Sequence, residues 1–140
     1  MKLEQADIII EAIKAEAQNM HLKPLTIVVL SADGTVRASI AQTGASPARF
    51  AIARGKAEGA LTMRCHSRKL AEMAEARPEF FASLNALEEI QGIVAAAGAL
   101  LVKDSDGALM GSVGISGDTS DNDEACAEAA ITAAGLELWQ

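Results

Sequence analysis

Two cationic side chains in the middle of the chain could together hold an acidic small molecule. Arg49 and Lys56 lie seven residues apart, so on a helix they would lie two turns apart on nearly the same face. Phe50, next to Arg49, would supply an apolar wall for the same ligand. A basic face that contacts only solvent produces the same pattern, since Arg54 belongs to this segment too. Both interpretations stay open on the sequence alone.

A glycine-rich segment near the C-terminus is the second candidate for ligand binding. The run from Gly114 to Gly117 leaves an apolar segment and leads into a predicted helix. Glycines let the backbone approach a ligand closely, and free amides at the start of a helix attract anions such as carboxylates. The candidate ligand-binding residues here are Ser116, Gly117, Thr119 and Asp123. In the alternative interpretation, Ser116, Thr119 and Asp121 only cap the helix, as these residue types commonly do.

These candidates are not accompanied by a motif for nucleophilic or nucleotide chemistry. Ser116 follows an apolar segment, but its surroundings do not match the Gly-x-Ser-x-Gly pattern of a nucleophile elbow. The glycine patterns of phosphate-binding and dinucleotide-binding loops are absent from the sequence. Cys65 and Cys126 are far apart and have no second Cys or His at metal-ligand spacing, which predicts two free thiols.

The elements that must position these residues follow from periodicity and turn signals. Ile9, Ile13 and Ala17 lie at helical spacing, Asp33-Gly34 is a strong hairpin signal, and Ser46-Pro47 is typical of a helix start with Ser as the cap. The predicted helices span residues 3–20, 46–61, 67–76, 80–87 and 121–138, and the predicted strands span residues 25–30, 35–40, 93–102 and 108–115.

This order of elements predicts an α+β fold, an α/β sandwich in which helices pack on an antiparallel sheet. Two hairpins supply most of the sheet, for which we expect about five strands. The sequence contains no internal repeat, linker or low-complexity segment. We therefore expect one domain over residues 1–140.

Composition limits the partners. A net charge of −7 argues against nucleic acid, which is bound by Lys and Arg, and against anionic lipid. The longest apolar stretch is about half of what a membrane span needs, and the first residues do not form a signal peptide, so we expect a cytoplasmic protein without membrane contact. Alanine-rich helix faces favour close packing between copies, which predicts a homo-oligomer.

Several motifs, in order along nearly the whole chain, resemble those of one family. Asp33-Gly34 matches its first hairpin, and the segment from Ser46 to Ala57 is similar to its Ser-x-x-x-Ala-x-x-Lys-Ala helix. The segment from Gly111 to Thr119, followed by Asp123, resembles its closing Gly-x-x-Gly-Val-Ser-Gly-Gly-Thr…Asp signature. On these motifs the sequence resembles the GlcG/HbpS-like family, which includes the C-terminal domain of PduO-type cobalamin adenosyltransferases.

The sequence departs from the family pattern at three places. Asp118 replaces a glycine of the closing signature, and Ala97 and Leu100 interrupt a usual Gly-Gly-x-Pro segment. The third departure follows the second predicted strand, where residues 41–43 read Ala-Gln-Thr in place of a common Arg-x-Asp.

The resemblance implies a profilin-like domain that forms dimers or higher oligomers and binds a small molecule, with heme or a related tetrapyrrole as the leading candidate. Histidine is a common heme ligand, and His21 and His66 are the only histidines. The resemblance favours His21, at the end of the first predicted helix, as a ligand of the heme iron. A lone histidine is also an ordinary surface or capping residue, so this alternative stays open.

Two other functions fit the same sequence. One is an enzyme, or an accessory subunit, that acts on a small organic acid in a catabolic pathway, with a pocket between subunits. In that case the candidate catalytic residues are Lys56, as electrostatic clamp or acid–base group, and Asp123, as base or orienting group. The missing Arg-x-Asp after the second strand would then indicate a pocket adapted away from the common family pattern. The other function is a scaffold without a small-molecule ligand.

Overall fold

The centre of the fold is a strand that is apolar on both faces. All six residues of β1 (Thr26–Ser31) are buried, as expected for a β-branched, apolar run that is covered by helices on both sides. The computed structural model describes residues 1–90 and 92–140. In it β1 lies second in a five-stranded antiparallel sheet of order β2-β1-β4-β3-β5. The predicted α+β class is confirmed.

Two hairpins form most of the sheet, as the turn signals predict. β1 pairs with β2 (Val36–Ala41), and β3 (Ala99–Lys103) pairs with β4 (Leu109–Ser116). Gly34 and Gly107 both have φ of +83° in the two connections, a conformation that glycine adopts at little cost. Antiparallel pairing of β1 with β4 joins the hairpins and places Thr26 opposite Ser116.

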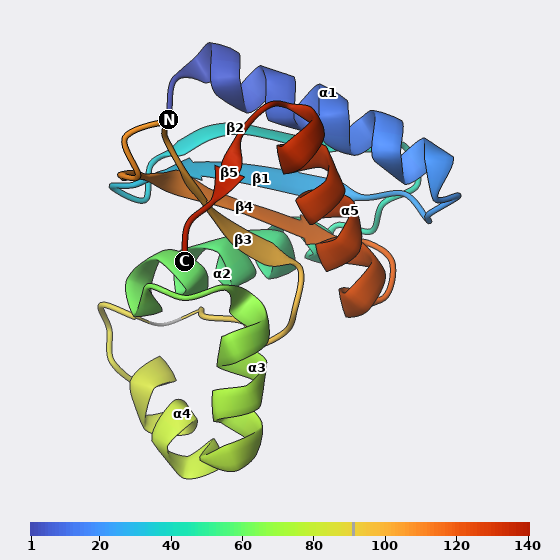
Figure 1. Ribbon diagram of the computed structural model, residues 1–140. Coiled ribbons are helices and arrows are strands. Elements are labelled where there is room, and N and C mark those ends of the chain that lie inside the picture. The colour runs from blue at the N-terminus through green and yellow to red at the C-terminus, as the bar shows by residue number, and fades with distance from the viewer. Residues whose placement is uncertain (91) are drawn as a thin grey trace.

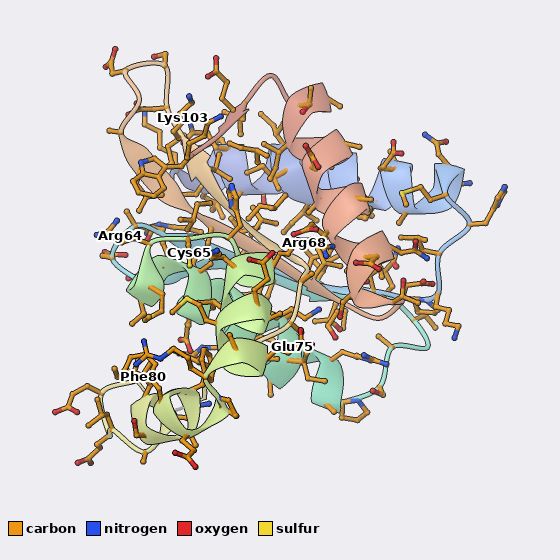
Figure 2. All side chains as sticks on the ribbon, turned by 60° about the horizontal axis from the view of Figure 1, so that its bottom comes forward. Arg64, Cys65, Arg68, Glu75, Phe80 and Lys103 are labelled. Atoms are coloured by element: carbon orange, nitrogen blue, oxygen red, sulfur yellow. The ribbon has the colours of Figure 1, made fainter. Side chains whose placement is uncertain are left out.

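Helices cover both faces of this sheet (Figure 1). α1 (Leu3–Asn19) and α5 (Ser120–Ala133) lie on one face, and α2 (Ala48–Met63) lies on the other. α3 (Ser67–Ala76) and α4 (Pro78–Asn85) form a lobe beyond α2 (Figure 1), and Phe80 lies on α4 (Figure 2). Among the described residues, no helix has the length and apolar character to cross a membrane.

α2 lies unusually close to the sheet because its contact residues are small. Ala53, Ala57 and Ala60 are fully buried against β1, β3 and β4. A Cβ atom at Gly114 on β4 would overlap the carbonyl oxygen of Ala53. This close approach brings the side chains of α2 to the end of β4 and the start of α5.

Several predicted boundaries are wrong, each for a local reason. The predicted strand 93–102 begins only at Ala99, because the preceding residues contact α2, where Val94 N–H donates to Gly55 O over 3.2 Å. The predicted helix 121–138 ends at Ala133, since Gly135 has φ of +73° and the chain turns into β5 (Glu137–Leu138) beside β3.

The starts of α2 and α4 also differ from the prediction, by two residues each. Ser46 does not cap α2 with its side chain; Pro47 is the N-cap residue and the helix begins at Ala48. α4 begins at Pro78, earlier than predicted, because proline is well tolerated in the first turn of a helix. Cys65 and Cys126 are free thiols, as predicted.

Candidate functional site

At the start of α5, side chains accept hydrogen bonds from several backbone amides. Thr119 is the N-cap residue, and its Oγ1 accepts a hydrogen bond from Asn122 N–H over 3.2 Å. Asp118, in the glycine position of the family motif, accepts hydrogen bonds from Lys23 N–H, Thr119 N–H and the side-chain amide of Asn122. These bonds lower the pKa of Asp118 to about 2. The capping interpretation is therefore confirmed for Thr119, and the amides of Asp118, Thr119 and Asn122 already have side-chain acceptors.

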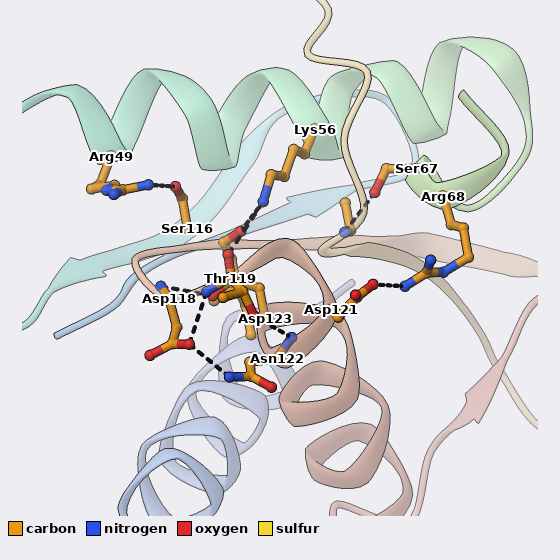
Figure 3. A network of polar contacts seen from close by, with 12 residues as sticks. Arg49, Lys56, Ser67, Arg68, Ser116, Asp118, Thr119, Asp121, Asn122 and Asp123 are labelled. Carbon is orange, nitrogen blue, oxygen red and sulfur yellow. Dashed lines mark hydrogen bonds and ion pairs between the residues drawn. The ribbon is translucent and has the colours of Figure 1, made fainter. Parts of the chain in front are cut away.

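The other two residues of the predicted capping set have different partners (Figure 3). Ser116 Oγ accepts a hydrogen bond from the Arg49 guanidinium over 3.2 Å. Asp121 pairs with Arg68 of α3 over 2.6 Å, and Glu124 pairs with the same guanidinium over 2.5 Å. Capping is thus wrong for Ser116 and Asp121, and the acidic residues at this helix start are largely balanced within the chain.

Lys56 and Asp123 form a buried ion pair between α2 and α5. Their side chains are 3% and 1% exposed, and Lys56 Nζ lies 3.3 Å from Asp123 Oδ2. Lys56 Nζ also donates to Ile115 O over 3.0 Å, and Asp123 Oδ1 accepts from Asp118 N–H over 3.1 Å. Burial lowers the pKa of Lys56 and raises that of Asp123, because each charge loses hydration.

A glycine completes the enclosure of this pair. Gly98 has φ of +119°, and a Cβ atom there would lie 2.7 Å from Lys56 Nζ and 3.1 Å from Asp123 Cβ. Neither side chain can contact a ligand from solvent in this arrangement. Lys56 and Asp123 therefore connect α2, the end of β4 and α5, and a catalytic role for them stays a prediction.

Arg49 lies two turns before Lys56 and differs from it in exposure and partners. Its side chain is half-buried and reaches the end of β4, where Ser116 Oγ is its hydrogen-bond partner. Gly117 follows Ser116 and, together with Arg49, lines a pocket of about 200 Å³. Phe50 points elsewhere on α2 and is 41% exposed. The structure thus brings Arg49, Ser116 and Gly117 together.

The sequence did not single out Lys23 and Pro24, which line this pocket together with Gly44, Ala45 and Ser46. Lys23 and Pro24 belong to the connection between α1 and β1, and no motif links them to Arg49. Their proximity follows from the sheet order, which places the beginning of β1 beside the end of β4.

The two histidines have different environments. His21 is exposed, directly after α1, with φ of +54°. His66 is half-buried, and its Nδ1 accepts a hydrogen bond from Leu101 N–H over 3.0 Å. Burial lowers the pKa of His66. Within residues 1–90 and 92–140, no group of three or more His, Cys, Asp or Glu side chains could hold a metal ion.

Comparison with a family model gives the decisive match. The model described as haem degrading protein HbpS-like matches residues 1–132. The chain belongs to the HbpS-like family. The predicted resemblance is therefore confirmed over nearly the whole chain.

Solved structures of similar fold agree with the family assignment. A PduOC:heme complex is 22% identical, with a TM-score of 0.87 over 100% of this chain and 99% of that chain. The Klebsiella pneumoniae protein ORFY is 20% identical, with a TM-score of 0.84 over 96% of this chain and 90% of that chain. HbpS is 23% identical, with a TM-score of 0.80 over 95% of this chain and 89% of that chain. No curated protein sequence matches the chain.

Proposed function

We propose that this HbpS-like protein binds heme or a related tetrapyrrole, with His21 as a ligand of the iron. The observation that carries the proposal is the exposed imidazole of His21 at the end of α1, in a chain whose family is HbpS-like and whose fold is that of a PduOC:heme complex. Bound heme would supply an iron centre whose potential and reactivity depend on its axial ligands.

The donor set of the chain fits this group. Among the described residues the imidazole of His21 has no hydrogen-bond partner, since only the backbone N–H of this residue donates, to Gln18 O over 3.1 Å. Both ring nitrogens are therefore available to a ligand. His66 is less suitable, because its Nδ1 already accepts the Leu101 amide and the ring is half-buried. The end of α1 also carries Met20 and Leu22, both half-buried apolar side chains beside the imidazole in sequence.

A single copy does not enclose a ligand of this size. Sites for small molecules and cofactors usually bury most of the ligand in a cleft of several hundred Å³. Among the described residues, a pocket of about 430 Å³ is lined in part by four charged side chains and by neither histidine. We therefore propose that heme lies between copies of a homo-oligomer, each contributing the His21 surface.

We also propose a cytoplasmic location, which the two free thiols support.

The alternative function is an enzyme or accessory subunit for a small organic acid. Its candidate catalytic residues are Lys56 and Asp123. Lys56 is 2% exposed and Asp123 1% exposed, so the chain would have to open around α5 before either could act on a substrate. The half-buried Arg49 is the residue through which such a protein would first contact an acid.

Titration of the purified protein with hemin tests the proposal. We expect a saturable Soret change that His21→Ala abolishes or weakens at least tenfold. Gln18→Ala is the matched control, because Gln18 is exposed on the last turn of the same helix and should leave binding unchanged. A non-saturating signal, or a saturable one that His21→Ala does not alter, would contradict His21 ligation.

A further inference from the structure

Three connections of the fold meet at one small pocket. Lys23 and Pro24 come from the connection between α1 and β1, Ser46 from the connection before α2, Arg49 from the first turn of α2, and Gly117 from the connection before α5. The pocket has a volume of about 200 Å³, which suits a single functional group rather than a macrocycle. Two of the lining side chains are cationic.

Arg49 differs from the other cations of the chain. In the part that the structure describes, six of the twelve Lys and Arg side chains form an ion pair. Of the other six, five belong to exposed residues and only Arg49 is half-buried. Among the described residues, the one hydrogen-bond partner of its guanidinium is the neutral hydroxyl of Ser116. A guanidinium has five N–H donors in a planar fork, so Arg49 keeps donors free for an anion.

The backbone adds positive potential at the same place. The first turn of α2 contains no acidic residue, and its N-cap makes no side-chain hydrogen bond. The positive end of the helix dipole is therefore not balanced from within the helix. This observation is independent of the guanidinium and has the same sign.

A buried hydroxyl without a partner lies on the same face of the sheet. Thr26 is 1% exposed, and its Oγ1 has no hydrogen-bond partner among the described residues. Thr26 is opposite Ser116 in the β1–β4 register, so the two side chains lie on one face, the face on which Arg49 contacts Ser116. A buried polar atom without a partner costs free energy, so an unused hydroxyl lies opposite the hydrogen-bond partner of Arg49.

We propose that Arg49 and Lys23 form a binding site for a carboxylate group, with Ser46 as a supporting hydroxyl and Ser116 as the residue that positions the guanidinium. A carboxylate matches the guanidinium fork. A phosphate dianion is disfavoured because the Asp118 carboxylate accepts the backbone N–H of Lys23 over 3.0 Å and brings negative charge close by. Where the ligand is a tetrapyrrole, this proposal rests on the proposed function, since His21 is two residues from Lys23 and the site would then hold a propionate. The other source is a free small acid.

Paired titrations separate the two sources. Hemin and hemin dimethyl ester differ only in their propionates, and each is titrated into the wild type, Arg49→Gln and Lys23→Gln. Arg54→Gln is the control, because Arg54 lies on the same helix, is exposed and pairs with Glu58. The same proteins are titrated with succinate, and the Nε–H resonance of Arg49 is followed in the wild type, so that the test does not depend on a variant that folds.

The outcomes are distinct. If a propionate is held, Arg49→Gln weakens hemin binding at least tenfold, Lys23→Gln weakens it severalfold, and neither change affects the ester. If a free acid is held, succinate shifts the Arg49 resonance saturably and Arg49→Gln removes this binding, even where hemin does not bind at all and the proposed function fails. The proposed site would be disproved if Arg49→Gln and Lys23→Gln leave the affinity for hemin unchanged and succinate does not shift the Arg49 resonance.

Discussion

Arg49 and Lys56 lie on the same face of α2, two turns apart, yet they have opposite environments. Lys56 meets a carboxylate of α5 and is sealed from solvent, with Asp123 3.3 Å away. Among the described residues, Arg49 has no partner on α5. Its guanidinium donates to the Ser116 hydroxyl at the end of β4, and the half-buried residue lines a pocket. Spacing on the helix placed both cations on one face, and the position of α5 determined which of them is neutralised.

The difference separates structural from binding roles. A buried ion pair has lost its hydration, so removing one partner leaves a costly uncompensated charge. A half-exposed cation retains part of its hydration and contributes little to stability, but it is free to meet an incoming anion. We therefore expect substitutions of Lys56 to affect folding and substitutions of Arg49 to affect ligand binding.

The largest effect is expected for Lys56→Met. This change leaves the Asp123 carboxylate buried without its cation, and breaking such a pair costs about 3–5 kcal/mol of stability. Urea unfolding followed by circular dichroism measures the loss. The cost should become smaller at acid pH, because protonation removes the uncompensated charge of Asp123.

The double variant Lys56→Met with Asp123→Asn distinguishes charge from packing. Asn retains an oxygen that can accept the Asp118 amide but carries no charge, so the double variant should regain a large part of the stability lost by Lys56→Met. A double variant no more stable than the single one would mean that the lysine stem and the carboxylate act through packing alone.

A smaller effect is expected for Asp118→Ala at the start of α5. Losing a carboxylate that accepts three hydrogen bonds should cost about 1–2 kcal/mol at pH 7, as for loss of a good helix cap. The folded-state pKa of Asp118, about 2, is below its ordinary value of 3.8. Its contribution is therefore complete above pH 4 and is lost as the pH falls from 4 toward 2.

Thermal unfolding of wild type and Asp118→Ala over this pH range checks the sign. The difference in Tm should be constant between pH 5 and 7 and should shrink below pH 4. The pKa of Asp33 is lowered to about 2 as well, but both proteins keep that residue, so it cancels in the comparison. A difference that does not depend on pH would exclude the charge of Asp118 as the cause.

The fold was largely predictable because its signals are local. Apolar β-branched runs and Asp-Gly turns define both hairpins, and periodicity defines α1. The misjudged segments depend on contacts that are distant in sequence. Val94 in the segment before β3 donates to Gly55 of α2, and this segment does not extend β3. Residues 137–138 leave the predicted helix and pair with β3.

The candidate site was predictable only in part. The spacing of Arg49 and Lys56 on one helix face indicated two candidate cations, but it could not show that Asp123 would bury one of them. Lys23 carries no motif, and its position beside Arg49 follows from the β1–β4 pairing. Thr26 has no feature in the sequence that distinguishes it from other strand residues. The β1–β4 register places it opposite Ser116, and its hydroxyl has no partner among the described residues.

The smallest effect on stability is expected for Arg49→Gln. This variant tests most directly the contrast between Arg49 and Lys56. Arg49 has no carboxylate partner within the described residues, and its guanidinium donates one hydrogen bond, to Ser116, so its replacement should lower the free energy of unfolding by no more than about 1 kcal/mol. Urea unfolding in ligand-free buffer measures this value beside that of Lys56→Met. In excess carboxylate, bound ligand should stabilise the wild type according to its concentration and Kd, and Arg49→Gln should not gain. A loss of several kcal/mol without ligand would instead make Arg49 a structural residue like Lys56, and the contrast between the two ends of α2 would disappear.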